Sequence, residues 1–398
     1  MIPKTTAKKP ARSKADRIAG SLRQEIISGR LSPGAMLPKW DDLQTQFRVC
    51  RPTLTQAVEG LKRDGFVRTH RSQGTFVHDR PPHLVRFGIV FASGPSRRLL
   101  GLGGWNQFWD HLAKAAPLVE REFGVELPVF YDVCDERSAG HAALELAVRR
   151  QTVGGLIIVG TPSLLYLPTI TEFALPKVAI FDGADGLAIG CPQLYFDFDS
   201  FVSRSLEMVK AEGRRRVAFF HVPGDANNTE LEALRRRGIA NAVPGESIDS
   251  RYLREMSQDD YWQTPAHWHF QVGRAGIGNV VRLLLDRPVE QRPDALIVSD
   301  DNLAPSVLAG VIAAGIRVPD ELLVLTHVNW PTYGADVVPI QRLGFDVRSL
   351  LRRCVETIAS VRAGDPVPEM QRLPALLEAE ASQLAASTEL STNNVAVV

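Results

Sequence analysis

The chain has 398 residues, of which 44% are hydrophobic and 23% charged, and its formal net charge is +1. These values are typical of a folded protein of two or three domains, and they exclude a chain that is disordered throughout. The longest apolar runs, such as Gly155–Gly160, are much shorter than the roughly 20 residues that span a bilayer, so no membrane helix is expected. The basic start lacks the apolar stretch of a secretory signal, which predicts a cytoplasmic location. The four cysteines are scattered, and the sequence therefore predicts neither a disulfide framework nor a metal site.

The charge is unevenly distributed along the chain. Residues 1–80 carry 16 Lys and Arg against 7 Asp and Glu, a net charge of +9, whereas the remaining 318 residues have a net charge of −8. This separation indicates that the N-terminal part meets a polyanion. A basic tail in solvent is the alternative, and it accounts for residues 1–14. It does not account for Arg48, Arg51 and Arg68, which recur among apolar residues with helical or strand patterning.

Three helices are predicted in the basic N-terminal part. Apolar residues every four positions predict the first helix over residues 15–28, and Gly29 ends it. A second, short helix begins near Trp40, where two aspartates suit the positive N-terminal end of a helix. The third carries Pro52 in its first turn, the position at which proline is tolerated.

The outward side of the third helix carries side chains that can contact DNA. They are Arg51, Thr53, Thr55, Gln56 and Lys62. Arg pairs with guanine and Gln with adenine, while Thr contacts thymine methyl groups or phosphates. Two short β-like runs follow, residues 66–70 and 75–78, around a basic turn that contains glycine. This order predicts a winged helix-turn-helix, with the third helix in the major groove and the wing on the DNA backbone or in the minor groove.

Separated motifs in this part resemble the GntR family of bacterial transcription regulators. In chain order they are residues 26–34, Leu37-Pro38, residues 51–58, residues 64–67 and residues 73–77. The resemblance covers residues 15–78 and implies DNA contacts at Lys39, Arg51, Thr53, Thr55 and Gly74. With the outward side of the third helix and the wing, the expected DNA-binding residues are Lys39, Arg51, Thr53, Thr55, Gln56, Lys62, Arg71, Gln73 and Gly74.

Three positions depart from the family pattern. Asp41 stands where the family usually has an arginine, Cys50 replaces the serine that caps the recognition helix, and Thr55 replaces a common base-reading arginine. We therefore expect an operator that differs from the family's commonest one. The alternative for the whole set is a solvated face of a small interaction domain.

The rest of the chain alternates strand and helix patterns after a proline-bearing linker, residues 79–83. The expected strands are residues 85–91, 125–131, 155–159, 177–181, 216–221, 295–299 and 322–326. The expected helices are residues 105–123, 139–151, 230–237, 272–285 and 303–314. Two such α/β halves predict a two-lobed domain over residues 84–376, with a ligand bound at the carboxyl ends of the strands between the lobes. Residues 377–398 are expected to be disordered.

This half resembles the LacI/GalR-type effector domain, which is similar to periplasmic sugar-binding proteins. The matching pieces are residues 87–90, 154–158, 213–219, 294–298 and 315–320. A GntR head on a periplasmic-binding-protein-like body is similar to the arabinose-repressor-like branch. The resemblance implies effector contacts at strand ends and from aromatic side chains of the first helix, at Trp105, Phe108, Asp182, Asp300 and His327. Carboxylates accept hydrogen bonds from sugar hydroxyls but also pair with cations, so the ligand class stays open, and loop capping or core packing is the alternative for each residue.

The remaining motifs do not indicate catalysis. His267-Trp268-His269 lacks the spacing of a zinc site and is expected to form an aromatic loop or to pack at a strand edge. The glycines of residues 101–104 lack the Lys-Ser/Thr ending of a P-loop. We expect no enzyme activity and no cofactor. The predicted function is a ligand-responsive repressor that binds double-stranded operator DNA as a homodimer and responds to a small molecule, with a sugar as the candidate. The alternatives are a DNA-binding architectural protein whose lobes bind nothing and an enzyme with a regulatory head.

Overall fold

The computed structural model describes residues 13–71, 73–95, 107–160, 162–180, 190–221, 268–271, 277–331 and 337–384. The chain divides into two compact units. The first comprises Met1–Gly94, Phe123–Pro192 and Val355–Val367, and the second comprises Pro95–Glu122, Gln193–Cys354 and Pro368–Val398. We call residues 13–78 the head, the rest of the first unit the first lobe, and the second unit the second lobe. Within the described ranges, no helix has the length and apolar character needed to cross a membrane.

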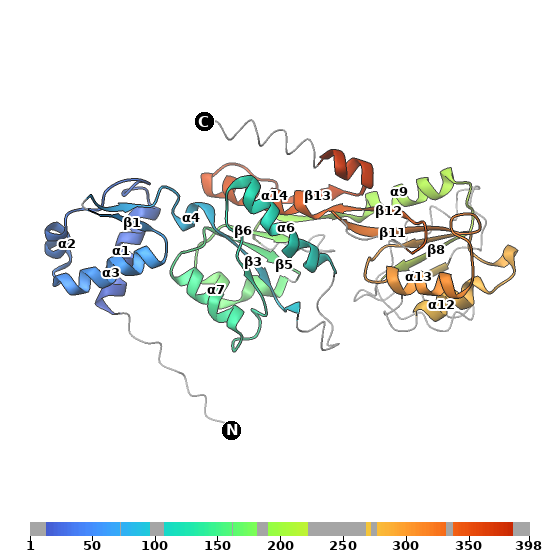
Figure 1. Ribbon diagram of the computed structural model, residues 1–398, viewed down its shortest axis with the longest axis horizontal. Coiled ribbons are helices and arrows are strands. Elements are labelled where there is room, and N and C mark those ends of the chain that lie inside the picture. The colour runs from blue at the N-terminus through green and yellow to red at the C-terminus, as the bar shows by residue number, and fades with distance from the viewer. Residues whose placement is uncertain are drawn as a thin grey trace, which may run out of the picture. The chain divides into compact units, whose positions relative to one another are not determined.

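The head consists of three helices and a β-hairpin (Figure 1). Its elements are α1 (Lys14–Ile27), α2 (Trp40–Phe47), α3 (Arg51–Arg63), β1 (Val67–His70) and β2 (Gly74–Val77). A capping box between Ser13 and Asp16 starts α1. Gly29, with φ of +78°, follows its last turn in a conformation that favours glycine. The two strands pair antiparallel from Val67↔Val77 to His70↔Gly74, which confirms the winged helix-turn-helix expected from the sequence.

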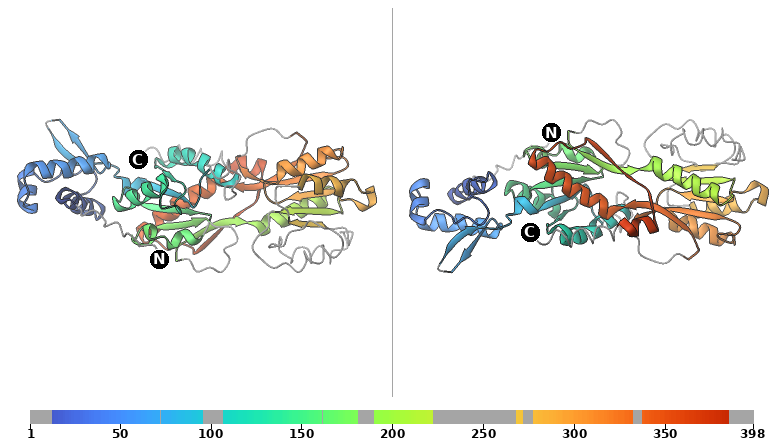
Figure 2. Two further views of the ribbon diagram at one scale, coloured as in Figure 1. Left: turned by 90° about the horizontal axis from the view of Figure 1, so that it is seen from below. Right: turned by 90° about the horizontal axis from the view of Figure 1, so that it is seen from above.

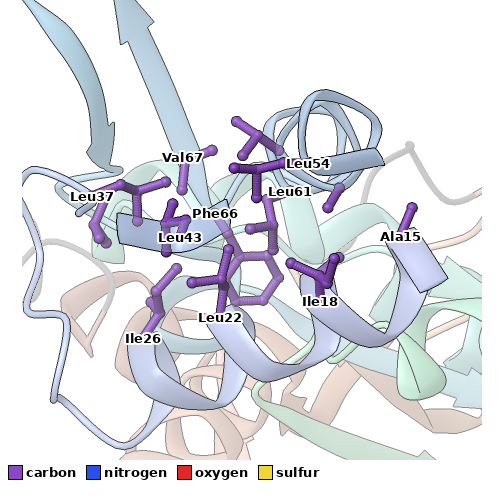
Figure 3. Close-up of a cluster of buried hydrophobic side chains, with 14 residues drawn as sticks. Ala15, Ile18, Leu22, Ile26, Leu37, Leu43, Leu54, Leu61, Phe66 and Val67 are labelled. Atoms are coloured by element: carbon purple, nitrogen blue, oxygen red, sulfur yellow. The ribbon is translucent and has the colours of Figure 1, made fainter. Parts of the chain in front are cut away.

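One apolar core holds these elements together (Figure 3). Leu22 of α1, Leu54 and Leu61 of α3, and Phe66 are each 0% exposed. Burial of one such side chain contributes about 1.5–3 kcal/mol to folding. Because the apolar side of α3 packs into this core, its polar side is left on the surface.

The first α/β sheet has six strands in the order β13-β7-β6-β5-β3-β4. These are β3 (Phe87–Phe91), β4 (Val129–Phe130), β5 (Gly155–Val159), β6 (Lys177–Ile180), β7 (Gln193–Asp197) and β13 (Met370–Pro374). The pairs of β3 with β4 and β5, of β5 with β6, and of β7 with β13 are parallel. Short elements beside it are α4 (Pro82–Val85), a 3-10 helix (Pro162–Tyr166) and α8 (Pro168–Thr171).

Helices cover both faces of β5. Leu156 and Ile158 pack in one cluster with Leu144 and Val148 of α7 (Ala139–Arg149). On the other face, Gly155 leaves room for Ile358 of α14 (Val347–Ala363), because a Cβ on this glycine would lie 2.5 Å from the Ile358 side chain. Burial on both faces accounts for the continuous apolar runs in the sequence.

The second sheet has the order β14-β12-β11-β10-β8-β9. Its strands are β8 (Val217–His221), β9 (Trp268–Gln271), β10 (Ala295–Val298), β11 (Leu323–Trp330), β12 (Gln341–Asp346) and β14 (Leu376–Leu377). Among the described strand pairs of this second sheet, only the pair of β12 with β14 is antiparallel. The second lobe also contains α6 (Gln107–Phe123), α9 (Phe198–Ala211), α12 (Ile277–Leu285), a 3-10 helix (Val289–Gln291) and α13 (Ala304–Ala313).

Alternate residues of β10 face different helices. Leu296 and Val298 belong to the cluster formed by α12 and α13, whereas Ala295 and Ile297 belong to the cluster formed by α9. The helices α12 and α13 lie side by side (Figure 2). This two-sided covering of a mostly parallel sheet confirms the α/β fold class.

Several boundaries differ from those expected. The linker segment is partly built into the first unit, because Pro82 and His83 are buried and begin α4. The tail expected to be disordered from residue 377 is helical over residues 378–384. That expectation was wrong for this stretch because Ala381 packs against Val328 and Trp330. Residues 385–398, the expected helix at 230–237 and the glycines at 101–104 lie outside the described residues.

Two strands also differ in length from the expectation. β4 is limited to two residues, whereas β11 continues to Trp330 because it pairs with β12 as far as Asp346. His269 lies on β9, which is the edge strand of its sheet, as the sequence indicated.

Substituting Leu54→Ala should destabilise the head by about 2–5 kcal/mol, because it opens a cavity where α3 meets the core. The fluorescence of Trp40, the one tryptophan in residues 1–80, reports unfolding of the head when the other tryptophans are replaced by phenylalanine. Thr55→Ala on the exposed side of α3 is the control, and it should leave the midpoint of the urea unfolding transition almost unchanged. Equal midpoints for the Leu54→Ala variant and the parent protein would contradict this packing.

Candidate nucleic-acid interface and effector site

The N-terminal end of α3 is exposed and carries a positive charge. Cys50 is the N-cap residue, and Arg51 is the first helical residue. The guanidinium carbon of Arg51 lies 6.0 Å from the centroid of the Trp40 ring, a cation–π contact that links α3 to the start of α2. Lys39, the exposed N-cap of α2, precedes Trp40. The structure therefore brings the expected residues Lys39 and Arg51 to the same part of the head.

The next polar residues of α3 are arranged around the same end. The Thr55 hydroxyl donates a hydrogen bond of 3.0 Å to the Arg51 carbonyl, and both Thr55 and Gln56 are exposed. Thr53 is half-buried, and its Oγ1 lies 3.3 Å from Cys50 Sγ. Arg51, Thr55 and Gln56 are thus exposed at this end of α3, whereas Thr53 is more enclosed.

Lys62 lies on the same side of α3 but near its other end. At 1.5 Å per residue it is about 16 Å along the helix from Arg51. Its Nζ lies 3.6 Å from the Glu59 carboxylate, an exposed pair of small energetic weight. This placement suits a phosphate contact better than a base contact.

The wing presents the remaining expected residues. Arg71 and Gln73 are exposed in the turn between β1 and β2. Gly74 has φ of +120°, and a Cβ at this position would lie 3.4 Å from Met36 Sδ. Only glycine adopts this backbone conformation without strain, so Gly74 shapes the tip of the wing.

Cys50 has a property that the sequence comparison did not reveal. Hydrogen bonds from the side chain and the backbone of Thr53 lower the pKa of its thiol. The residue is exposed, and its Sγ lies 3.3 Å from Thr53 Oγ1. A thiol with this environment has more thiolate character than an ordinary cysteine.

The expected effector residues are only partly described. Trp105 and Asp182 lie outside the described residues. Phe108 of α6 packs edge-to-face on Phe196 with a centroid distance of 5.1 Å, and Phe196 stacks on Phe345 at 4.3 Å. Phe108 is therefore held by aromatic packing within the second lobe.

Asp300 lies two residues after the end of β10 and shapes the turn there. Its Oδ1 accepts hydrogen bonds from the backbone N–H and from the side-chain amide of Asn302, both at 2.7 Å. Asn302 Oδ1 in turn accepts a bond of 3.0 Å from the backbone N–H of Gln107. The carboxyl end of β10 and the start of α6 therefore meet at this turn.

A second polar pair at this point was not singled out from the sequence. Asp301 Oδ2 accepts a hydrogen bond of 2.7 Å from Asn329 Nδ2. Asn329 is 1% exposed, and its Oδ1 has no hydrogen-bond partner among the described residues. A buried acceptor of this kind needs a donor from water or a ligand. The signal in the sequence was an asparagine three residues after the end of the strand expected over residues 322–326.

His327 occupies a different environment from these residues. Its ring lies within β11, 6% exposed, and packs on Phe198, Phe201 and Phe345 at centroid distances of 6.0, 5.7 and 5.5 Å. Neither ring nitrogen has a partner in the described part of the chain, and burial lowers the pKa of His327 to about 3. The structure places this histidine in the apolar core of the second lobe, away from the strand end.

In the ranges described, no group of three His, Cys, Asp or Glu residues could hold a metal ion.

Replacing His327→Leu should raise the free energy of unfolding by about 1–3 kcal/mol at pH 7.5, because it removes two buried polar atoms that lack partners. The pKa of His327 lies below its unfolded value of 6.5, so the unfolded chain takes up a proton first as the pH falls. The titration of His327 therefore leaves the free energy of unfolding unchanged above pH 6.5 and decreases it as the pH falls from 6.5 toward 3. Urea titrations at pH 7.5 and 5 should therefore show a smaller pH dependence in the variant, and a less stable variant at both pH values would contradict this placement.

Comparisons with known proteins agree with this organisation. Residues 14–77 match the family model of bacterial regulatory proteins of the gntR family, and residues 206–379 match the model of the periplasmic binding protein-like domain. The arabinose metabolism transcriptional repressor of Geobacillus stearothermophilus is 24% identical over 373 residues, covering 88% of this chain and 94% of that protein. The protein of the same name from Halalkalibacterium halodurans is 22% identical over 379 residues, covering 89% of this chain and 92% of that protein.

A solved structure from Rhizobium etli, described as a LacI-family regulator, has a TM-score of 0.51 at 15% identity. It covers 73% of this chain and 96% of that chain, and it supports the fold alone. The two matched segments follow each other in the order that the sequence motifs indicated. The chain therefore joins an N-terminal winged helix-turn-helix domain of the gntR type to a periplasmic binding protein-like domain, and it is similar along most of its length to two arabinose metabolism transcriptional repressors.

Proposed function

We propose that this protein is a repressor that binds operator DNA through its head and responds to a small molecule bound by its α/β body. The observation that carries the DNA-binding part is the exposed end of α3, where Arg51, Thr55 and Gln56 surround a helix start packed on a complete apolar core. Their donors and acceptors match base edges in the major groove. Lys62 and the wing residues supply contacts to the sugar-phosphate backbone of the DNA.

The proposed operator complex contains two copies of the chain. A single head offers few phosphate contacts, and paired heads on paired half-sites supply the affinity that regulators of this type need. Operator DNA also fixes the compartment, so we propose a cytoplasmic homodimer. The alternative of a solvated interaction face does not account for the order of helix, helix and wing.

The proposed effector site lies at the carboxyl ends of β10 and β11. Asp300, Asp301 and Asn329 gather acceptor oxygens at this place, and the Asn329 Oδ1 is buried without a partner in the described residues. Hydroxyl groups of a sugar are suitable donors for such oxygens. The expected contacts of Trp105, Phe108 and Asp182 and the cleft between the lobes stay predictions. His327 reaches the ligand only if the core around it opens.

The names of the two relatives make arabinose the first compound to test. A thermal-shift screen should include other sugars, sugar acids, polyols and nucleosides. A ligand at about 100 times its Kd adds roughly 2.7 kcal/mol of stability. The absence of any stabilising compound would favour the alternative of an architectural protein whose lobes bind nothing.

Substituting Arg51→Ala should weaken specific operator binding by about 1–3 kcal/mol, because a bidentate base contact is lost. Gel-shift titration against operator and random DNA measures the effect. Arg30→Ala removes the same charge from an exposed position outside the proposed interface and should bind operator almost as the parent does. Unchanged operator affinity in the Arg51→Ala variant would remove Arg51 from the interface.

Substituting Asp300→Ala or Asn329→Leu should leave operator binding without effector unchanged, yet raise the effector concentration needed for a response by about tenfold or more. Each variant removes an acceptor from the proposed site and leaves the head intact. Asp320→Ala, an exposed carboxylate elsewhere in the second lobe, is the control. A normal response in both site variants would show that the effector binds elsewhere.

A further inference from the structure

A groove of about 620 Å³ lies within the first unit, where the head meets the first lobe. Its head wall comes from α1 and the last residues of α3, and its lobe wall comes from the end of α7 together with Phe173. Hydrogen bonds join the two walls, from Gln24 Nε2 to Gln151 Oε1 at 2.8 Å and from Arg150 Nη1 to Asp64 Oδ1 at 3.0 Å. We call this feature the junction groove.

The junction groove is rich in guanidinium groups. Five arginines line it, namely Arg17, Arg23, Arg63, Arg149 and Arg150. They face only two lining carboxylates, Asp16 and Asp64. The charge of the lining is therefore clearly positive, although the body of the protein beyond residue 80 is acidic overall.

The two lining carboxylates are already engaged. Asp16 accepts hydrogen bonds from the backbone N–H of Ser13, at 3.2 Å, and from its hydroxyl, at 2.8 Å, in the capping box of α1. The Asp64 side chain, 5% exposed, accepts from Arg23 of the head at 2.8 Å and from Arg150 of the lobe at 3.0 Å. One buried carboxylate thus pairs with two arginines, one from the head and one from the first lobe, and offsets only one of their two positive charges.

Two of the other arginines, Arg17 and Arg63, keep most of their binding capacity. Arg63 is 68% exposed at its side chain, with its Nε 4.0 Å from the nearest Asp64 oxygen. Arg17 is exposed on α1, and no ion pair to it is found in the described residues. Arg149 pairs with Glu145 one turn earlier on α7. Planar guanidinium groups bind phosphate oxygens through paired hydrogen bonds, so this set favours a phosphorylated ligand.

The place of the groove argues against DNA as its occupant. Arg63 is displaced by about 100° around α3 from Lys62, the proposed phosphate contact, and it lines the groove together with residues of the first lobe. Leu146, 49% exposed, and the half-buried Phe173 add apolar surface to the same groove. Apolar surface beside arginines suits a small molecule with a ring and phosphates better than a DNA backbone.

We propose that the junction groove binds a phosphorylated small molecule, with phosphates on Arg17 and Arg63 and its organic part against Leu146 and Phe173. This site is distinct from the effector site proposed at the strand ends of the second lobe. A ligand held by both walls fixes the head on the first lobe, because it adds contacts parallel to the Asp64–Arg150 pair. Binding therefore restricts the orientations in which the head can approach DNA.

The test uses the full-length protein, ATP without magnesium as the probe, and isothermal titration calorimetry in a buffer free of phosphate. Adenosine, which shares the ring and sugar but lacks the phosphates, is the paired compound. The groove variant carries Arg17→Gln and Arg63→Gln. The matched control carries Arg137→Gln and Arg353→Gln, two exposed arginines outside the groove, so that both variants lose the same charge.

The expected result is saturable binding of ATP by the parent and by the control, and about tenfold or greater weakening in the groove variant. Adenosine should not bind measurably. Absence of ATP binding, equal weakening in both double variants, or equal binding of adenosine would each overturn the proposal. Titrations of the same variants with operator DNA test whether the groove contacts DNA instead of a small molecule. If the groove variant loses operator affinity while its ATP binding is unchanged, the groove contacts DNA and the proposal fails, whatever the outcome for the Arg51→Ala variant.

Discussion

The packing of α3 on the core of the head is the constraint on which the proposed DNA contacts depend. Leu54 and Leu61 are fully buried on one side of the helix. This burial alone is enough to keep Arg51, Thr55 and Gln56 exposed on the other side. The helical period of 3.6 residues converts this single choice of buried positions into a fixed set of exposed ones. The same packing carries the last turn of α3 to the first lobe, where the Asp64 carboxylate accepts hydrogen bonds from arginines of both domains.

Parallel sheets impose a comparable constraint on the body. Strands that run in one direction end at one edge, so residues distant in the sequence become neighbours there. Asp301 comes shortly after β10, and Asn329 lies near the end of β11. Their side chains nevertheless share a hydrogen bond of 2.7 Å. The turn after β10 also receives the start of α6 through Gln107 and Asn302. The result is a concentration of acceptor oxygens beside an aromatic cluster, which suits a ligand rich in hydroxyl groups.

The uneven charge of the chain has more than one structural use. The positive head matches a polyanion, but its arginines do not all face the proposed DNA surface. Arg23 is buried against Asp64 and lies 5.2 Å from the centroid of the Phe66 ring, where it supports the fold. Arg17 and Arg63 line the junction groove instead. A net charge therefore indicates the class of partner but does not assign individual arginines to it.

The sequence by itself determined the fold class, the order of the domains and most of the candidate DNA contacts, because these follow from local periodicity and from motifs whose residues are close together in the chain. Sequence reasoning named His327 as an effector residue and did not consider Asn329, since the strand was expected to end at residue 326. Only the tertiary structure shows that the first is enclosed by phenylalanines and that the second meets Asp301. The helical stretch after residue 377 and the junction groove were likewise beyond the sequence, because Ala381 and Arg150 find their partners far along the chain. Which strand ends, helix ends and side chains meet is decided by long-range packing, and that information is not contained in the local pattern.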